Sequence, residues 1–140
     1  MTGRLDMRLA NDVQEVARVI DCLEEFGAAN GIPADQSLRF GLVLDELITN
    51  IVSYGIKGRS DAVMTLAIEH RDGLLHAELA DNGPAFDPLA AETSPPGGDI
   101  ETREVGGLGL TLVKSFMDRL DYRRVDGFNR LTMEMKLKAV

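Results

Sequence analysis

The stretch LVLDELITNIVSYG, residues 42–55, most constrains the fold of this chain. Residues three and four apart share one side of a helix, so the apolar residues here gather on one broad face. The expected members of that face are Phe40, Val43, Leu44, Leu47, Ile51 and Tyr54. Glu46 and Asn50 lie four residues apart at the edge of this face, where burying a polar group costs free energy unless it has a hydrogen-bond, ionic or metal partner. The pattern predicts a central helix whose two polar residues are either solvated flanks or part of a site.

The bulk composition narrows the class of protein. A chain of 140 residues is the size of one domain, which we expect over residues 1–140. It is long enough to fold without disulfides or structural metals. The net charge of −8 disfavours a nucleic-acid partner bound through its phosphates. Cys22 is the only cysteine, so no disulfide can form within the chain, which suits a reducing compartment. The chain has neither an apolar run of membrane-spanning length nor the apolar core of a signal peptide, so we expect a cytoplasmic location.

The first third of the chain is expected to form one strand and two helices. Apolar and polar residues alternate over residues 5–10, which predicts a strand at a sheet edge. Asn11 or Asp12 is expected to cap the first helix, and Asp35 is expected to cap the central helix. The central helix is expected to end near Gly55.

The remainder is expected to form two strand pairs separated by a helix. Strands at residues 62–70 and 74–80 flank the turn-forming Arg71-Asp72-Gly73 and should pair as an antiparallel hairpin. A helix over 108–120 precedes strands at 121–125 and 130–137, which flank a turn at Asp126-Gly127. This order of elements predicts an α/β sandwich of the α+β kind, with a mixed, largely antiparallel sheet and helices on one face.

A glycine cluster, GGLGL at residues 106–110, opens the last helix. Unpaired amides at a helix N-terminus carry partial positive charge and bind phosphate, and glycines let a ligand approach them. The cluster is not a P-loop, because no Gly-Lys-[Ser/Thr] follows it. A simple helix-entry turn is the alternative interpretation. The segment before it, residues 87–105, lacks any periodic pattern and is either a lid over a site or a floppy insertion.

Asp81 follows an apolar strand and begins the turn Asp81-Asn82-Gly83-Pro84. Its carboxylate can accept a hydrogen bond from the exocyclic amine of adenine, whereas guanine offers a carbonyl oxygen at that place. The alternative is an aspartate that only caps the turn. The oxygen of Asn50 suits Mg²⁺, and Glu46 one turn away could orient a hydroxyl and take its proton.

Taken in order, three segments resemble known boxes of the GHKL ATPase superfamily, which includes gyrase and histidine-kinase ATP domains. Residues 46–50 resemble the N box, 81–88 the first glycine box and 106–110 the second. The chain looks most like bacterial anti-sigma-factor serine-protein kinases, over essentially its whole length. The resemblance implies the histidine-kinase-like ATPase fold, ATP and Mg²⁺ as cofactors, and an ATP lid over about 87–105.

The resemblance also assigns roles to individual residues. It implies that Asn50 binds Mg²⁺, that Glu46 is the general base and that Asp81 reads adenine N6. The other residues expected along the nucleotide are Gly83, Ala85, Arg103, Gly107, Leu108, Gly109, Leu110 and Thr111. Two positions depart from the family pattern: Ala85 replaces a glycine of the first box, and Tyr54 replaces a histidine often found after the N box.

By the same resemblance, the chain is expected to be an ATP-binding anti-sigma factor and protein serine/threonine kinase. It would phosphorylate an anti-anti-sigma (STAS-type) partner and sequester a sigma factor, without contacting nucleic acid or membrane, and it would form a homodimer. Three alternatives stay open. They are a nucleotide-dependent partner-switching binding module with little or no kinase activity, the detached ATP domain of a histidine kinase, and an α/β domain that binds no nucleotide.

Overall fold

The computed structural model describes residues 3–89 and 107–138, and within them five strands form one sheet. The spatial order is β1-β2-β3-β5-β4, and every neighbouring pair is antiparallel, within the expected largely antiparallel class. The expected edge position of the first strand is confirmed. The strand bounds are β1 (Gly3–Leu9), β2 (Met64–Arg71), β3 (Leu74–Asp81), β4 (Arg119–Val125) and β5 (Phe128–Lys136).

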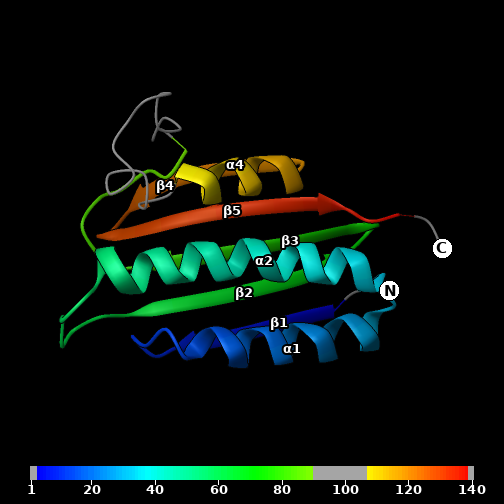
Figure 1. Cartoon of the computed structure of the whole chain (residues 1–140), viewed down its shortest axis with the longest axis horizontal. Coiled ribbons are helices and arrows are strands. Elements are labelled where there is room, and N and C mark those ends of the chain that lie inside the picture. Colours follow the sequence, from blue (N-terminus) through cyan, green and yellow to red (C-terminus); the bar gives the residue numbers. More distant parts are fainter. Residues whose placement is uncertain (1–2, 90–106, 139–140) are drawn as a thin grey trace.

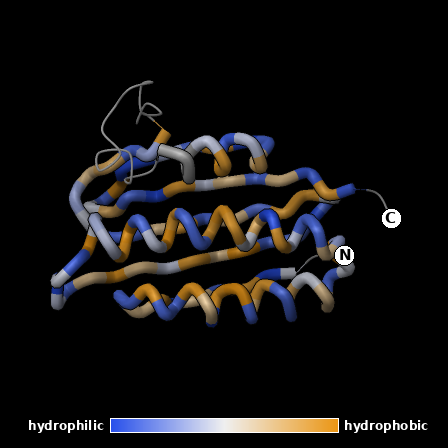
Figure 2. Tube along the Cα trace, in the orientation of Figure 1, coloured by the Kyte–Doolittle hydropathy of each residue, from blue (hydrophilic) through white to orange (hydrophobic). Residues whose placement is uncertain are grey.

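Three α-helices of the described residues cover the same face of this sheet, with α2 between α1 and α4 (Figure 1). Their bounds are α1 (Glu15–Asn30), α2 (Ala34–Asn50) and α4 (Gly107–Phe116). Apolar and polar residues recur along each helix, as expected when one side is buried and the other is wet (Figure 2). No helix in the described part of the chain is both long enough and apolar enough to cross a bilayer.

The expected apolar face of α2 forms the centre of the core. Its residues Phe40, Val43 and Leu44 are completely buried, and so is Ile48, which was not expected on this face. They belong to one apolar cluster with inward side chains of β2, β3 and β5, among them Leu66, Ile68, Leu75, Ala77 and Met133. Each such side chain larger than alanine contributes roughly 1.5–3 kcal/mol by leaving water. This packing fixes the helix against the sheet.

Tyr54 was expected on that face, and the structure corrects this prediction. Beyond Asn50 the helix widens into a π-helical turn, η1 (Ile51–Gly55), closed by a 2.9 Å hydrogen bond from Ile56 N to Ile51 O. The wider turn changes the direction of each side chain, and Tyr54 is 56% exposed. The expected end of the helical segment near Gly55 is confirmed.

The expected helix caps are wrong at both long helices. No side-chain cap is found at α1 or α2, which begin after Gln14 and Pro33. Asp12 accepts a hydrogen bond from the backbone N of Gln14 in the turn before α1. Asp35 lies in the first turn of α2, because the extended backbone of Pro33 already starts the helix. Its carboxylate pairs instead with Lys138 at 2.6 Å.

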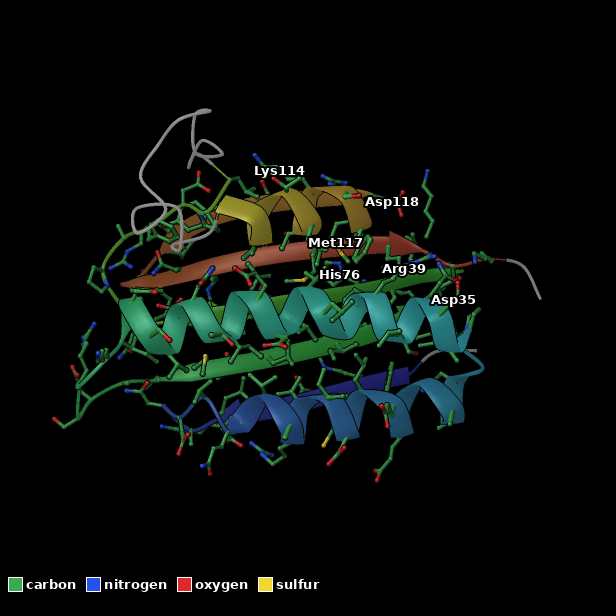
Figure 3. All side chains as sticks on the ribbon, in the orientation of Figure 1. Asp35, Arg39, His76, Lys114, Met117 and Asp118 are labelled. Carbon is green, nitrogen blue, oxygen red and sulfur yellow. The ribbon has the colours of Figure 1, made fainter. Side chains whose placement is uncertain are left out.

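The last helix ends at Phe116, four residues earlier than expected. Asp118 docks on β5, because its backbone N donates to Glu134 O at 2.8 Å and its Oδ2 accepts from Lys136 N at 2.7 Å. The chain therefore enters β4 at once, and Leu120 lies in a strand. Figure 3 shows Met117 and Asp118 at this end of α4, near Asp35 and Arg39 of α2. The Arg39 guanidinium lies 6.0 Å from the centre of the Phe116 ring.

Both hairpin turns occur where the sequence predicts them. Asp72-Gly73 and Asp126-Gly127 each have two successive positive φ angles. Two-residue hairpin turns of type I′ require this geometry, which Asp and Gly tolerate better than other residues. The register of both hairpins is therefore set locally.

Glu15 connects the end of β1 to the start of α1. Its carboxylate accepts from Ala10 N at 2.7 Å and from Arg18 Nε at 2.8 Å, and the Arg18 guanidinium also donates to Arg8 O at 2.7 Å. The hydrogen bond from Arg18, followed by that from Ala10, lowers the pKa of Glu15 from 4.5 to about 2.

We expect Glu15→Gln to lower the free energy of unfolding at pH 7, because the ionised carboxylate is lost. The contribution of Glu15 is fully present above pH 4.5 and is lost as pH falls toward 2, so the gap between variant and wild type should shrink between pH 5 and 3. Chemical denaturation at several pH values measures this gap, with the exposed Glu24→Gln as control. A gap that stays constant with pH would contradict the assignment.

Candidate functional site

A cavity of about 290 Å³ opens between the C-terminal end of α2 and the loop that follows β3. These elements and the start of α4 lie at one end of the sheet, on the left in Figure 1. The cavity is mostly apolar, with walls that include Leu47, Ile51, Leu79 and Leu131. Among the described residues, five polar side chains also line it: Asn50, Tyr54, Asp81, Tyr122 and Asn129. Apolar walls with a few convergent polar groups are typical of small-molecule sites, and the smallest of these have volumes of about 300 Å³.

Asp81 is the buried carboxylate of this cavity and is only 5% exposed. Its Oδ1 accepts hydrogen bonds from Gly83 N at 2.9 Å and from Asn129 Nδ2 at 3.1 Å. Each carboxylate oxygen has two lone pairs, so these donors satisfy Oδ1. The other oxygen, Oδ2, makes no hydrogen bond within the described residues. The arrangement therefore offers one acceptor to a ligand in the cavity.

Asn129 is the residue that sequence reasoning missed. It is 7% exposed, and its carboxamide contacts Asp81, Tyr122 and the loop after β3. A signal was present in the sequence. Along β5 the inward positions alternate with outward ones, and Asn129 takes the same parity as the buried Leu131, Met133 and Met135. A polar residue at an inward strand position requires partners, and here it finds them in the site.

The loop after β3 is also held from its outer side. Arg59 Nη1 donates to Asn82 O at 2.7 Å, and Arg124 Nη1 donates to Gly83 O at 2.7 Å. The Asn82 side chain accepts from Val63 N at 2.8 Å. The sequence patterns did not predict that these residues hold the loop. Together they fix the backbone that carries the walls of the cavity.

Glu46 and Asn50 contact each other in the last turn of α2. Asn50 Nδ2 donates to Glu46 Oε1 at 3.2 Å, and both side chains are partly buried. This bond leaves the oxygen of Asn50 as the atom able to approach a cation. Within residues 3–89 and 107–138, no cluster of three or more His, Cys, Asp or Glu could hold a metal. A single carboxamide fits Mg²⁺, which keeps waters and takes most other ligands from substrate phosphates.

The other expected residues are distributed around this end of the molecule. Ala85 lines the cavity, whereas Gly83 is buried beside it. Residues 107–110, including Leu108 and Leu110, form the first turn of α4, whose amides have no partner within the helix. Thr111 is exposed. Arg103, Gly106 and nearly all of the expected lid lie outside the described residues.

The sequence of residues 9–135 matches the model of the family described as "Histidine kinase-like ATPase domain". The chain belongs to this family. The expected superfamily and fold are thereby confirmed, and no helix or strand outside the expected order was found in the described residues.

Several relatives of this chain are named as kinases or anti-sigma factors. Serine/threonine-protein kinase BtrW of Bordetella bronchiseptica is 38% identical over 98 residues, which are 69% of each chain. Serine-protein kinase RsbW of Listeria innocua is 35% identical over 81 residues, 55% of this chain and 52% of RsbW. An anti-sigma F factor of Clostridium botulinum is 29% identical over 77 residues, 55% and 54% of the two chains. The matched stretch thus spans about half the length of the last two relatives.

Solved structures share the fold. The RsbU and RsbW domains of a Mycobacterium tuberculosis protein superpose with a TM-score of 0.70 and 17% identity, over 96% of this chain and 32% of that one. A histidine kinase domain of Erythrobacter litoralis superposes with a TM-score of 0.55 and 18% identity, over 89% and 60%.

Gly83 lies where a side chain has no room, and this makes a testable prediction. A Cβ there would lie 2.8 Å from Asp81 Oδ1 and 3.1 Å from Gly55 O. We expect Gly83→Ala to destabilise the fold by about 1–3 kcal/mol, because the loop must shift. Gly55→Ala is the matched control, since the one described atom within 4 Å of its Cβ would be a methyl carbon of Ile51 at 3.9 Å. Equal effects in urea denaturation would contradict the close packing of this loop.

Proposed function

We propose that this chain is an ATP-binding anti-sigma factor and protein serine/threonine kinase. In this proposal it phosphorylates an anti-anti-sigma (STAS-type) partner and sequesters a sigma factor. The observation that carries the proposal is the apolar cavity lined by both Asp81 and Asn50, one able to accept from a base and the other able to hold a cation. The names of its relatives, RsbW, BtrW and anti-sigma F factor, support the choice of partners and reaction. A cytoplasmic location is part of the same proposal.

The base is proposed to enter the apolar cavity with its exocyclic amine toward Asp81. An ionised carboxylate accepts such a hydrogen bond, and it repels the carbonyl oxygen that guanine carries instead. Tyr54 and Phe86 line the same cavity and are exposed, so their rings are accessible to the flat face of a base. These features support adenine as the base.

The phosphates are proposed to lie between Asn50 and the first turn of α4. The amides of residues 107–110, which have no partner within the helix, and the helix dipole favour negative charge there. Mg²⁺, when bound, would neutralise charge that builds up on the phosphates during transfer. The oxygen of Asn50 is the protein ligand proposed for it, oriented by the hydrogen bond from Asn50 Nδ2 to Glu46. A further contact, from Arg103 to the phosphates, stays a prediction.

Glu46 is proposed to accept the proton of the substrate hydroxyl. Its carboxylate is partly accessible and lies one helical turn from Asn50, so a hydroxyl near the terminal phosphate can reach it. The partner's serine or threonine would supply that hydroxyl. A homodimer is proposed on the resemblance to the family alone.

The test is transfer of labelled phosphate from ATP to a candidate anti-anti-sigma protein. We expect Glu46→Gln to lower transfer by about 100-fold or more, since a general base contributes that much, while ATP affinity changes little. Asp45→Asn is the matched control, because Asp45 is the neighbouring carboxylate on the exposed side of the same turn, where it accepts a hydrogen bond from Thr49 Oγ1.

Transfer that survives Glu46→Gln unchanged would remove Glu46 as the base. Tight ATP binding by the wild type without transfer to any partner would favour the alternative, a nucleotide-dependent partner-switching module with little or no kinase activity. Absence of ATP binding would remove both functions.

A further inference from the structure

Asn129 and Asp81 lie side by side on adjacent strands, as directly paired residues of β5 and β3. We propose that Asn129 is a positioning residue that makes the cavity selective for 6-amino purines, acting through Asp81. The proposal rests on the nucleotide-binding function above. It concerns a residue that the sequence patterns did not single out.

The side-chain carboxamide of Asn129 makes all the hydrogen bonds it can. Its Nδ2 donates to Asp81 Oδ1 at 3.1 Å and to Pro84 O at 2.9 Å. Its Oδ1 accepts from Tyr122 OH at 2.6 Å and from Phe86 N at 3.1 Å. A carboxamide has two donor hydrogens and two acceptor lone pairs, so all four are satisfied. Turning the amide over would place acceptor against acceptor at Asp81 and Pro84 and donor against donor at Phe86, which fixes its orientation.

This fixed amide in turn fixes the carboxylate of Asp81. Together with Gly83 N, it occupies both lone pairs of Oδ1. The carboxylate cannot exchange its two oxygens without breaking both hydrogen bonds. The acceptor offered to a ligand is therefore a single oxygen, Oδ2, at one place in a buried site. Exact placement matters because hydrogen bonds weaken steeply when their angle is poor.

The consequence for specificity depends on the group at position 6 of the purine. A 6-amino purine can donate a hydrogen bond to a well-placed Oδ2 and binds more tightly for it, whereas a purine with hydrogen at position 6 makes no such bond. Loss of Asn129 should therefore weaken binding of the 6-amino purine and leave binding of the unsubstituted purine almost unchanged. A residue that merely supports the fold would weaken both equally.

The experiment compares the affinities of ATP and of purine riboside 5′-triphosphate, which lacks the 6-amino group. The full chain with Mg²⁺ is titrated by calorimetry. We expect the wild type to prefer ATP by about tenfold or more, as a hydrogen bond to a charged acceptor provides. In Asn129→Ala the preference should fall at least fivefold. Tyr122→Phe, which frees one lone pair of the same amide, should lower it less and tests the idea should Asn129→Ala not fold.

The matched control is Asn82→Ala. Asn82 is the neighbouring asparagine of the same loop, and its side chain also makes two hydrogen bonds, with Val63 N at 2.8 Å and Asp61 O at 2.7 Å, without contacting the Asp81 carboxylate. We expect it to leave the preference unchanged. An unchanged preference in both Asn129→Ala and Tyr122→Phe, beside a wild type that prefers ATP, would overturn the inference and leave the proposed function intact. No binding of either nucleotide to the wild type would overturn the proposed function itself.

Discussion

The packing of α2 across β2, β3 and β5 is the contact on which the rest of the structure depends. It buries Phe40, Val43, Leu44 and Ile48 completely and so fixes the rotation of the helix about its axis. With that rotation fixed, Asn50 must emerge at the end of the helix beside the cavity, and Glu46 one turn before it. The same apolar face that stabilises the fold thus determines where the polar rim points.

The polar part of the site follows a second constraint, which is that buried polar groups need partners. Asp81 and Asn129 come from strands that are far apart in the chain, and both are nearly inaccessible to water. They contact each other, and Tyr122 and backbone groups of the loop after β3 complete the set. Such a network is rigid, and a rigidly held carboxylate oxygen is what the proposed recognition of a 6-amino purine requires.

Local patterns in the sequence predicted much of this arrangement. The helical spacing of α2 and the Asp-Gly turns at 72–73 and 126–127 are short-range signals, and each predicted the element found. Asp81 was also predictable, because its strand end and glycine turn are adjacent in sequence. The pairing of Asp81 with Asn129 was not, since it depends on the register between β3 and β5.

The ends of elements were predicted less well. Apolar spacing continued to Leu120, but the contacts of Asp118 with β5 end α4 at Phe116. A tertiary contact outweighs a local preference there. Asp35 has the chemistry of a helix cap, but the extended backbone of Pro33 starts α2, so Asp35 lies inside the first turn and its exposed carboxylate is left to pair with Lys138.

The central claim is that the cavity binds an adenine nucleotide through Asp81 and Asn50. A thermal-shift scan of the wild type and of Asp81→Asn with ATP, ADP and GTP, each with and without Mg²⁺, tests it most directly. Ligand at 100 times its dissociation constant adds roughly 2.7 kcal/mol to the free energy of unfolding. The account predicts a shift of the wild type with adenine nucleotides but not with GTP, enhanced by Mg²⁺ for ATP and much reduced in Asp81→Asn. Equal shifts with ATP and GTP, or an undiminished ATP shift in Asp81→Asn, would contradict it.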